Sequence, residues 1–484
     1  MQKRKPLINI KLLLYAIGSL LLLEAGCMLI PLFTSIYFQE PQLIGWFKSI
    51  GITLATAVLF RYPFRKNHGE WGKREGYVVV TTIWIWYSIF SAIAFRLTGT
   101  FSTFTDAFFE SVSGFTTTGA SICSDVEQLA HSALVWRSFM QWLGGMGIIL
   151  LSLIFGFGGV QTYVAEATGP VKTRMSPRLH ETAMMLWGYY AISTIFVIFL
   201  LLIGGMGKFD ALCHAWSTIS TGGFSTKNAS IGYWDSAFIH YVVIFAVLFS
   251  SLNYSLTYFF FHGKFKLIGK DEETRRVFQI FFFLIIAVCL GNVLTHQGGL
   301  CEKNIRNSIF MTISSVTGTG FMTENFMDWH PALWSIILII MAFGGSSGST
   351  TGGIKIVRIT VLIKNSIEEF KRLLHPRAIL PLKISDKVIS METINNVSAF
   401  VSLYIIIVLM STLVFIVLGI GPTEAMGVAM SCVGNVGLGF GEVATGNFYI
   451  FHPAVKWFMC ALMIIGRLEI FTVLFIFTPT FWKR

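Results

Sequence analysis

The chain has 484 residues, of which 54% are hydrophobic and 13% are charged, and its formal charge is +11 at pH 7. Soluble domains carry about 25% charged residues, so this composition excludes an ordinary soluble protein and indicates one that crosses a membrane several times. Most Lys and Arg lie in short links between apolar segments, where orientation in a membrane places them. We therefore expect a lipid bilayer and no nucleic acid as partner.

The first 75 residues are predicted to form a pair of transmembrane helices, at residues 10–33 and 43–61. The link 34–42 contains no Lys or Arg, whereas the N-terminus and the link 61–74 are basic. The excess of basic residues on one side predicts that both ends of the pair are cytoplasmic. A cleaved signal peptide is the alternative, but the first apolar run is long and lacks a convincing small-residue cleavage site.

The rest of the chain divides into four repeats of one design, residues 76–181, 182–275, 276–388 and 389–484. In each repeat, a membrane helix leads to a short pore helix, a loop rich in Thr or Gly, and a returning helix. We expect the flanking helices at 77–95 and 133–157, 183–205 and 236–261, 277–294 and from 333, and 393–419 and 453–478. The pore helices are expected at 105–114, 210–219, 303–316 and 423–433.

The basic links between these segments all fall on one side of the membrane, as the topology requires. This predicts ten crossings, four half-crossing loops, and both termini in the cytoplasm. The expected fold is an all-α polytopic membrane protein with four pseudo-fourfold helix–pore loop–helix repeats around one central ion pore, plus the N-terminal helix pair.

The four loops are the strongest signal for function. The last glycine before an apolar residue recurs at Gly119, Gly223, Gly320 and Gly439. Backbone carbonyls can replace the water shell of K⁺, and Gly tolerates the backbone angles that aim successive carbonyls at one axis. One such loop could be an ordinary turn between membrane helices, but four copies at equivalent places indicate an ion-selective pore. The predicted selectivity filter comprises Thr116, Thr117, Thr118 and Gly119; Ser220, Thr221, Gly222 and Gly223; Thr317, Gly318, Thr319 and Gly320; and Val436, Gly437, Leu438 and Gly439.

Within this filter we expect K⁺ to be held at two residues of each loop. Because the four loops differ in sequence, we expect less strict selectivity than in a symmetric ring. Rb⁺ and Na⁺ are further candidate ions, and no organic cofactor is expected. The expected K⁺ positions are Thr117, Thr118, Thr221, Gly222, Gly318, Thr319, Gly437 and Leu438.

Acidic residues stand near the start of the pore helices. Asp106 and Asp210 lie the same distance before the first two loop glycines, where a helix N-terminus stabilises an acid. Repeats three and four do not keep that spacing, although Glu302 and Glu424 are nearby. The pore helices would thus direct their partial negative C-terminal ends toward a cation.

The returning helix of repeat three is interrupted by a glycine- and serine-rich segment, residues 344–353. This segment resembles a phosphate-binding loop but fails the pattern, because Ile354 separates the last Gly from Lys355. Glu24, in the first membrane helix, and His240, in repeat two, are polar residues within apolar segments. Both are expected to pack against neighbouring helices rather than to line the ion path.

These motifs together resemble the Trk/Ktr/HKT superfamily of K⁺ transporters, over nearly the whole chain. The resemblance implies a homodimer with one pore per subunit and a cytoplasmic nucleotide-binding regulatory subunit of the TrkA type. Lys355 and Arg358 would lie where a helix could couple to that subunit. The resemblance also implies a gate below the filter, formed by Gly344, Gly345, Ser346, Ser347, Gly348, Ser349, Thr350, Thr351, Gly352 and Gly353.

The same resemblance assigns Arg467 to the pore, near the gate. A charge at the bilayer centre costs about 3 kcal/mol or more, so it should face a cavity or a partner. A positive charge below the filter would raise the barrier to cations. The alternatives are an internal pair with Glu469 and a side chain that reaches to the membrane surface.

Two functions agree with these observations, and an enzyme is not among them, since no catalytic cluster stands out. The first is K⁺ uptake through a gated, channel-like pore. The second is a secondary transporter that couples K⁺ to Na⁺ or H⁺, which would also use a broken helix. The scarcity of Asp and Glu at membrane depth favours the pore.

Overall fold

The computed structural model describes residues 8–65, 72–154, 179–263, 269, 271–295, 300–377, 380–385, 387–444 and 446–483. Within them, all regular structure is helical apart from one two-stranded hairpin, so the expected fold class is confirmed. The part of the first returning helix expected at 155–157, and the link that follows it, lie outside the described residues.

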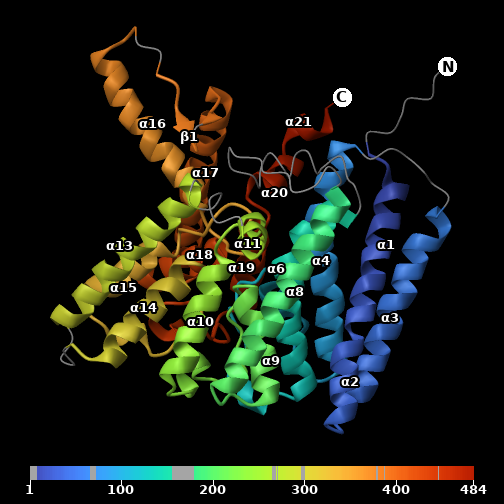
Figure 1. The fold of residues 1–484 in the computed structure, drawn as a ribbon. Coiled ribbons are helices and arrows are strands. Elements are labelled where there is room, and N and C mark those ends of the chain that lie inside the picture. The colour runs from blue at the N-terminus through green and yellow to red at the C-terminus, as the bar shows by residue number, and fades with distance from the viewer. Residues whose placement is uncertain are drawn as a thin grey trace, which may run out of the picture.

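The N-terminal helix pair consists of α1 (Ile10–Cys27), its continuation α2 (Leu29–Tyr37), and α3 (Leu43–Arg61). The two arms pack closely because Gly18 places no side chain between them. A Cβ at Gly18 would lie 2.7 Å from the carbonyl oxygen of Ala57. Figure 1 shows the pair at one flank of the molecule, beside α4 (Lys73–Leu97).

The four expected pore helices are present within two residues of their predicted ends. Each begins with an acid in its first turn and leads into one of the four loops. A short 3₁₀ helix follows each loop: η2 (Val126–Gln128), η3 (Ser230–Tyr233), η4 (Phe326–Asp328) and η5 (Gly441–Val443). The pore helices are α5 (Phe104–Phe115), α9 (Lys208–Ile219), α14 (Glu302–Val316) and α18 (Pro422–Gly434).

The outer helices of each repeat frame these pore helices. Those of repeats three and four that return from the loops begin alike, with a His N-cap followed by Pro. Proline suits the first helical turn, whose N–H groups lack partners within the helix. The outer helices are α4 and α6 (His131–Ile154), α8 (Leu179–Ile203) and α10 (Ala237–Ser250), α13 (Glu272–Thr295) and α15 (Pro331–Ile340), and α17 (Met391–Val417) and α19 (Pro453–Arg467).

The returning helices of repeats two, three and four are all interrupted, whereas the sequence predicted a break in repeat three alone. They resume as α11 (Tyr254–Phe261), α16 (Ile356–Leu374) and α20 (Phe471–Ile476). The expected unbroken helices at 236–261 and 453–478 are therefore wrong. In repeat two, the freed Ser251 carbonyl accepts the Ser346 N–H at 2.9 Å, so the glycine-rich segment of repeat three occupies the break.

The break in repeat four has a different cause. Glu469 and Ile470 have φ values of 55° and 46°, and a β-branched residue in that region is strained by about 1–3 kcal/mol. The strained turn redirects the chain toward α20, which is followed by α21 (Pro479–Trp482).

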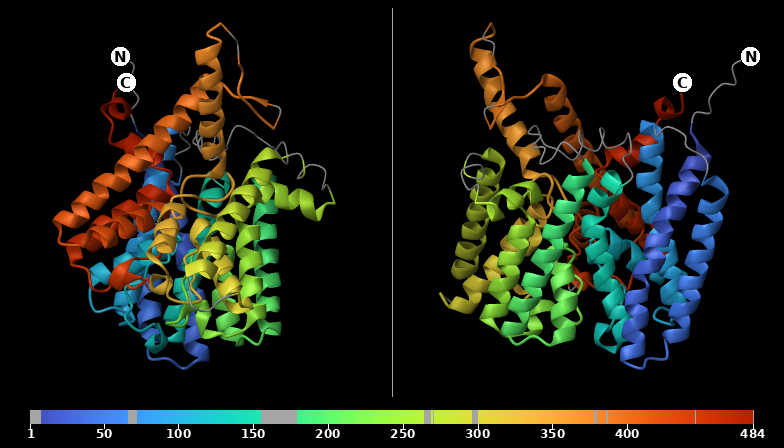
Figure 2. Two further views of the ribbon diagram at one scale, coloured as in Figure 1. Left: turned by 90° about the vertical axis from the view of Figure 1, so that its left-hand side faces the viewer. Right: turned by 45° about the vertical axis from the view of Figure 1, so that its right-hand side comes forward.

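Six described helices are long and apolar enough to span a membrane by length and composition: Ile10–Tyr37, Leu43–Phe64, which includes η1 (Tyr62–Phe64), Arg74–Leu97, Met184–Ile203, Glu272–Thr295 and Met391–Val417. Figures 1 and 2 show α16 and the hairpin of β1 (Lys383–Ile384) and β2 (Lys387–Val388) projecting at the end of the molecule where α21 also lies. The pore helix α9 lies toward the opposite end.

Substituting Ala for Gly18 should lower the melting temperature by several degrees, because overpacking costs about 1–3 kcal/mol. The matched control is Gly51→Ala, since a Cβ at Gly51 meets no atom within 4 Å and Ala is the better helix former. Thermal unfolding of both variants in detergent measures the difference. Equal melting temperatures would contradict the close packing of α1 on α3.

Candidate functional site

The four loops share one backbone conformation. Just after each pore helix, one residue has a positive φ, and the second residue after it has a positive φ as well. The first of these residues follows the helix after one intervening residue in repeats one to three and follows it directly in repeat four. Glycine adopts such angles without the Cβ penalty, and Asn is tolerated better than most other residues. The first positions are Thr117 (53°), Thr221 (53°), Gly318 (69°) and Asn435 (53°), and the second are Gly119 (83°), Gly223 (79°), Gly320 (78°) and Gly437 (81°).

A second feature repeats with the same register. In each loop, the N–H group between the two positive-φ residues donates to the carbonyl of a serine five residues earlier, in the last turns of the pore helix. These bonds turn the chain back at the end of the helix. They join Thr118 to Ser113 (2.9 Å), Gly222 to Ser217 (2.8 Å), Thr319 to Ser314 (2.9 Å) and Val436 to Ser431 (3.0 Å).

The loops form a closed ring. A Cβ added at the second glycine of any loop would lie about 2 Å from a carbonyl oxygen of the next loop, far inside van der Waals contact. The fourth loop returns to the first, so the four segments encircle one axis. The contacts are Gly119 to Gly222 O (2.2 Å), Gly223 to Thr319 O (2.0 Å), Gly320 to Val436 O (2.1 Å) and Gly437 to Thr118 O (2.2 Å).

In the fourth loop, the residue at the ring position is Gly437, so the alignment of Gly439 with the other three glycines is wrong. A Cβ at Gly439 would instead meet the Val443 carbonyl at 2.0 Å. The same register shift places Asn435 and Val436, not Gly437 and Leu438, opposite the K⁺ positions expected in the other loops. The serine at 431 is the sequence signal that would have given this register, because it matches Ser113, Ser217 and Ser314.

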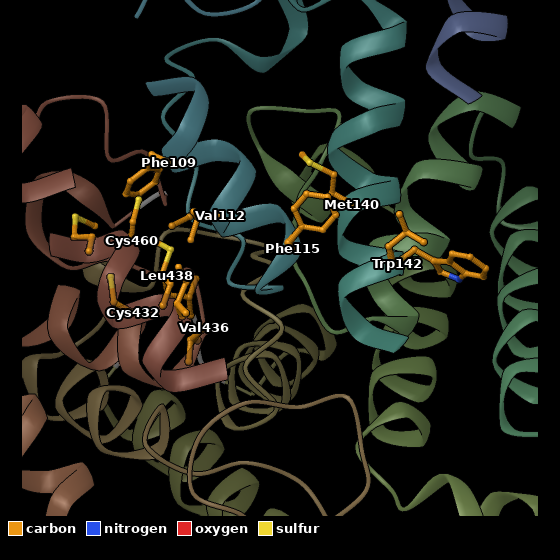
Figure 3. Packing of buried hydrophobic residues seen from close by; sticks show 14 of the residues in the cluster. Phe109, Val112, Phe115, Met140, Trp142, Cys432, Val436, Leu438 and Cys460 are labelled. Atoms are coloured by element: carbon orange, nitrogen blue, oxygen red, sulfur yellow. The ribbon is translucent and has the colours of Figure 1, made fainter. Parts of the chain in front are cut away.

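Buried apolar side chains hold the ring from outside. Figure 3 shows Phe115 of α5 beside Met140 of α6, and Val436 and Leu438 of the fourth loop near Cys432 of α18. All five residues are at most 1% exposed. Irregular backbone at membrane depth is tolerated only where it is enclosed by protein or lines a cavity, and this packing provides the enclosure.

Carboxylates join each pore helix to the limb of chain that follows its loop. The acids are visible in the sequence, but these contacts depend on residues that only the fold brings together. In repeat three the acid lies on the limb rather than on the helix. The bonds run from Ile122 N to Glu110 (2.8 Å), Thr226 Oγ1 to Asp210 (2.6 Å), Asn307 Nδ2 to Glu324 (2.5 Å) and Glu442 N to Glu424 (3.0 Å).

Two buried ion pairs reinforce this arrangement. Asp106, at the start of α5, accepts from Lys456 of α19 at 2.7 Å, which joins the first repeat to the last. Glu110 accepts from Arg137 of α6 at 2.6 Å, with both side chains almost fully buried. Arg137 also donates to the Ser225 carbonyl at 3.2 Å, so one side chain links the first and second loops.

The glycine-rich segment 344–353 lies directly beneath the ring. The Thr350 hydroxyl lies 3.3 Å from the Thr221 hydroxyl and 3.4 Å from the Ile219 carbonyl. A Cβ at Gly352 would meet the Gly434 carbonyl at 2.2 Å. The segment therefore contacts the second and fourth loops from the side of α16.

Two charged side chains hold the middle of this segment. Glu273 of α13 accepts from the N–H (2.5 Å) and the hydroxyl (2.7 Å) of Ser347. Lys355 donates to the Thr351 hydroxyl at 3.1 Å and also contacts the Thr351 carbonyl. Lys355 is buried, so its side chain faces the segment and not a partner surface.

Arg467 binds this segment from the end of α19. It is 6% exposed and donates to the carbonyls of Thr350 (2.9 Å) and Gly144 (3.0 Å). Glu469, the alternative partner considered for Arg467, accepts from Arg358 at 2.5 Å. Arg358 also stacks on the Phe400 ring, so it faces inward as Lys355 does.

The expected packing roles of Glu24 and His240 agree with their surroundings. Glu24 is fully buried and accepts from Ser91 of α4 at 3.1 Å. The His240 ring lies 2.9 Å from the Trp234 carbonyl.

Residues 46–484 match the family model of TrkH, described as a cation transport protein. The chain belongs to the TrkH family. It is 36% identical over 476 residues to the Trk system potassium uptake protein TrkH of Escherichia coli (strain K12), and the match covers 97% of this chain and 98% of that protein. It is also 33% identical to TrkH of Halomonas elongata, with 98% of this chain and 100% of that protein covered.

A solved structure of the TrkH family agrees with the fold. The crystal structure of the potassium transporter TrkH from Vibrio parahaemolyticus superimposes with a TM-score of 0.91 and 32% identity, and it covers 98% of this chain and 100% of that one. The chain is thus a multi-pass membrane protein of a cation transport family, and the family resemblance and the four-repeat architecture expected from the sequence are confirmed.

Arg137→Met should lower the melting temperature by several degrees, because it leaves Glu110 buried without its cation and such losses cost about 3–5 kcal/mol. Lys303→Met is the matched control. Its partner Asp235 is 76% exposed, and exposed pairs contribute about 0–1 kcal/mol. If thermal unfolding gives both variants the same midpoint, the buried pair does not stabilise the loops.

Proposed function

We propose that this protein takes up K⁺ across the bacterial cytoplasmic membrane through a gated, channel-like pore whose filter is built from the four loops. The observation that carries the proposal is the closed ring of loop glycines, each against a carbonyl of the next loop. Relatives of the chain are named potassium uptake proteins. With the register of the ring, the filter comprises residues 116–119, 220–223, 317–320 and 434–437.

The ring can stabilise a cation electrostatically although none of its loops places a carboxylate in the ion path. Four pore helices direct their C-terminal ends at the loops, where each helix carries a partial negative charge of about half an electron. Carbonyl oxygens then supply ligands that exchange readily, whereas a ring of carboxylates would bind a cation more tightly. The acids at the pore-helix starts stabilise the opposite, positive ends.

The gate of this pore is the segment 344–353, with Arg467 as its positive barrier. The segment touches the second loop through Thr350, and Arg467 holds the Thr350 carbonyl. In this state a guanidinium group lies below the filter. Opening requires the segment to leave Arg467 or both to move aside.

Regulation by a cytoplasmic nucleotide-binding subunit of the TrkA type, and assembly as a homodimer, complete the proposal. The basic segments that follow α16 support a cytoplasmic location for that end, and both termini would lie there too. Along α16, exposed apolar residues follow one stripe at Ile363, Ile367, Phe370 and Leu374, as expected of a helix with a protein partner.

The test of function is ⁸⁶Rb⁺ uptake into proteoliposomes, with K⁺, Na⁺ and choline as competitors. We expect flux down the Rb⁺ gradient without a coupling ion, and competition by K⁺. Gly223→Ser should reduce discrimination against Na⁺ about tenfold, equivalent to 1.4 kcal/mol, because a side chain there collides with the Thr319 carbonyl. Gly51→Ser serves as the control.

Flux that needs an imposed Na⁺ or H⁺ gradient would overturn this proposal and favour the coupled secondary transporter. In that case the four loops would form a binding site rather than a continuous filter.

The gate makes a separate prediction. Arg467→Gln should raise basal ⁸⁶Rb⁺ flux on the order of tenfold, since lowering a barrier by about 1.4 kcal/mol has that effect. Arg467→Lys should stay near the wild type, because it keeps the charge. A Gln variant with unchanged or reduced flux in the same proteoliposomes would exclude a barrier role for this charge.

A further inference from the structure

The four loops are braced in different ways. In the first and third loops, two threonine hydroxyls on either side of the first positive-φ residue bond to each other. In the fourth, the Asn435 amide reaches the Thr118 hydroxyl (3.0 Å) and the Met463 carbonyl (2.9 Å). The hydroxyl pairs are Thr116 with Thr118 and Thr317 with Thr319, both at 2.8 Å.

The second loop cannot form such a hydroxyl pair. Its residues at these two positions are Ser220 and Gly222, and glycine has no hydroxyl group with which the serine hydroxyl could form a hydrogen bond. The missing brace would leave one quarter of the ring less constrained than the others.

Gln141 of α6 fills this place from outside the loop. Its amide nitrogen donates to the Gly222 carbonyl at 2.6 Å, and its amide oxygen accepts from the Phe224 N–H at 3.1 Å. The two bonds lie on either side of Gly223, the ring glycine. Gln141 is fully buried, so no water competes for these groups.

The size of residue 222 is explained by the same contact. A Cβ at Gly222 would lie 2.4 Å from the Gln141 amide carbon. The space that a threonine side chain takes in the first and third loops is therefore taken by the glutamine. Residues 141 and 222 are complementary in volume and in hydrogen bonding.

One stripe of α6 supports the whole second loop. Residues four apart share a helix face, and Arg137, Gln141 and Gly145 follow this spacing. Arg137 donates to the Ser225 carbonyl, Gln141 holds 222 and 224, and a Cβ at Gly145 would lie 2.9 Å from the Ser220 Cβ. The second quarter of the ring is shaped by a helix of the first repeat.

We infer that Gln141 is the positioning residue of the second loop and that it sets the ion discrimination of that quarter of the filter. The inference rests on the proposed function of the ring. It requires that removing the glutamine loosens the backbone at Gly222 and Gly223, and that a threonine at 222 can replace it.

The experiment removes the side chain at position 141 and adds one at position 222, separately and together. Gln141→Ala, Gly222→Thr and the double variant are compared by ⁸⁶Rb⁺ flux and by the Rb⁺/Na⁺ permeability ratio in proteoliposomes. We expect the ratio to fall about tenfold in Gln141→Ala, and flux to fall more than tenfold in Gly222→Thr. The double variant should regain at least half of the wild-type permeability ratio and at least half of the wild-type flux, because the new hydroxyl can pair with Ser220.

Gln279→Ala, on an exposed position of α13, is the control for loss of an amide and should match the wild type. A wild-type ratio in folded Gln141→Ala, or a double variant no better than Gly222→Thr, overturns the inference. Thermal unfolding reads the same exchange without flux: Gly222→Thr should melt lower than the double variant. If wild-type protein passes no Rb⁺, the proposed function fails, and the melting order still decides whether residues 141 and 222 are complementary.

Discussion

The contact on which this structure depends is the approach of a loop glycine to a carbonyl of the next loop. At Gly119, Gly223, Gly320 and Gly437 the neighbouring oxygen occupies the place of a Cβ. A van der Waals conflict at one position would therefore displace two loops at once. The pore helices, the carboxylates that join each helix to its outer limb, and the apolar shell all serve to keep these four approaches equal.

The same demand for enclosed backbone explains the interrupted helices. A segment without regular structure at membrane depth needs partners for its N–H and C=O groups. The glycine-rich segment of repeat three obtains them from the break between α10 and α11, from Glu273, and from Lys355. Arg467, which precedes the irregular turn of repeat four, donates to the same segment. The interruptions in repeats two, three and four are thus parts of one arrangement.

Much of this could be predicted from the sequence, because membrane helices have strong length and composition signals and the repeats confirm one another. The pore helices were placed within two residues. The breaks in repeats two and four were missed because Ser251 and Ile470 carry no local breaker signal, and tertiary contacts decide them. Glycine spacing gives the wrong register for the fourth loop, whereas the serine at 431 matches the serines of the other three loops. The pairing of Glu110 with Arg137, and the hold of Gln141 on Gly222, depend on contacts between repeats.

The last repeat closes the ring against the first, and this has a consequence for biosynthesis. Gly437 meets Thr118, Lys456 neutralises Asp106, and Phe448 donates to the Ser121 carbonyl at 2.7 Å. All three partners in repeat four are C-terminal to the first three repeats, so they are synthesised last. A nascent or prematurely terminated chain thus has an open ring with one side missing and Asp106 unpaired. The ring of four loops is therefore complete only once the last repeat is in place.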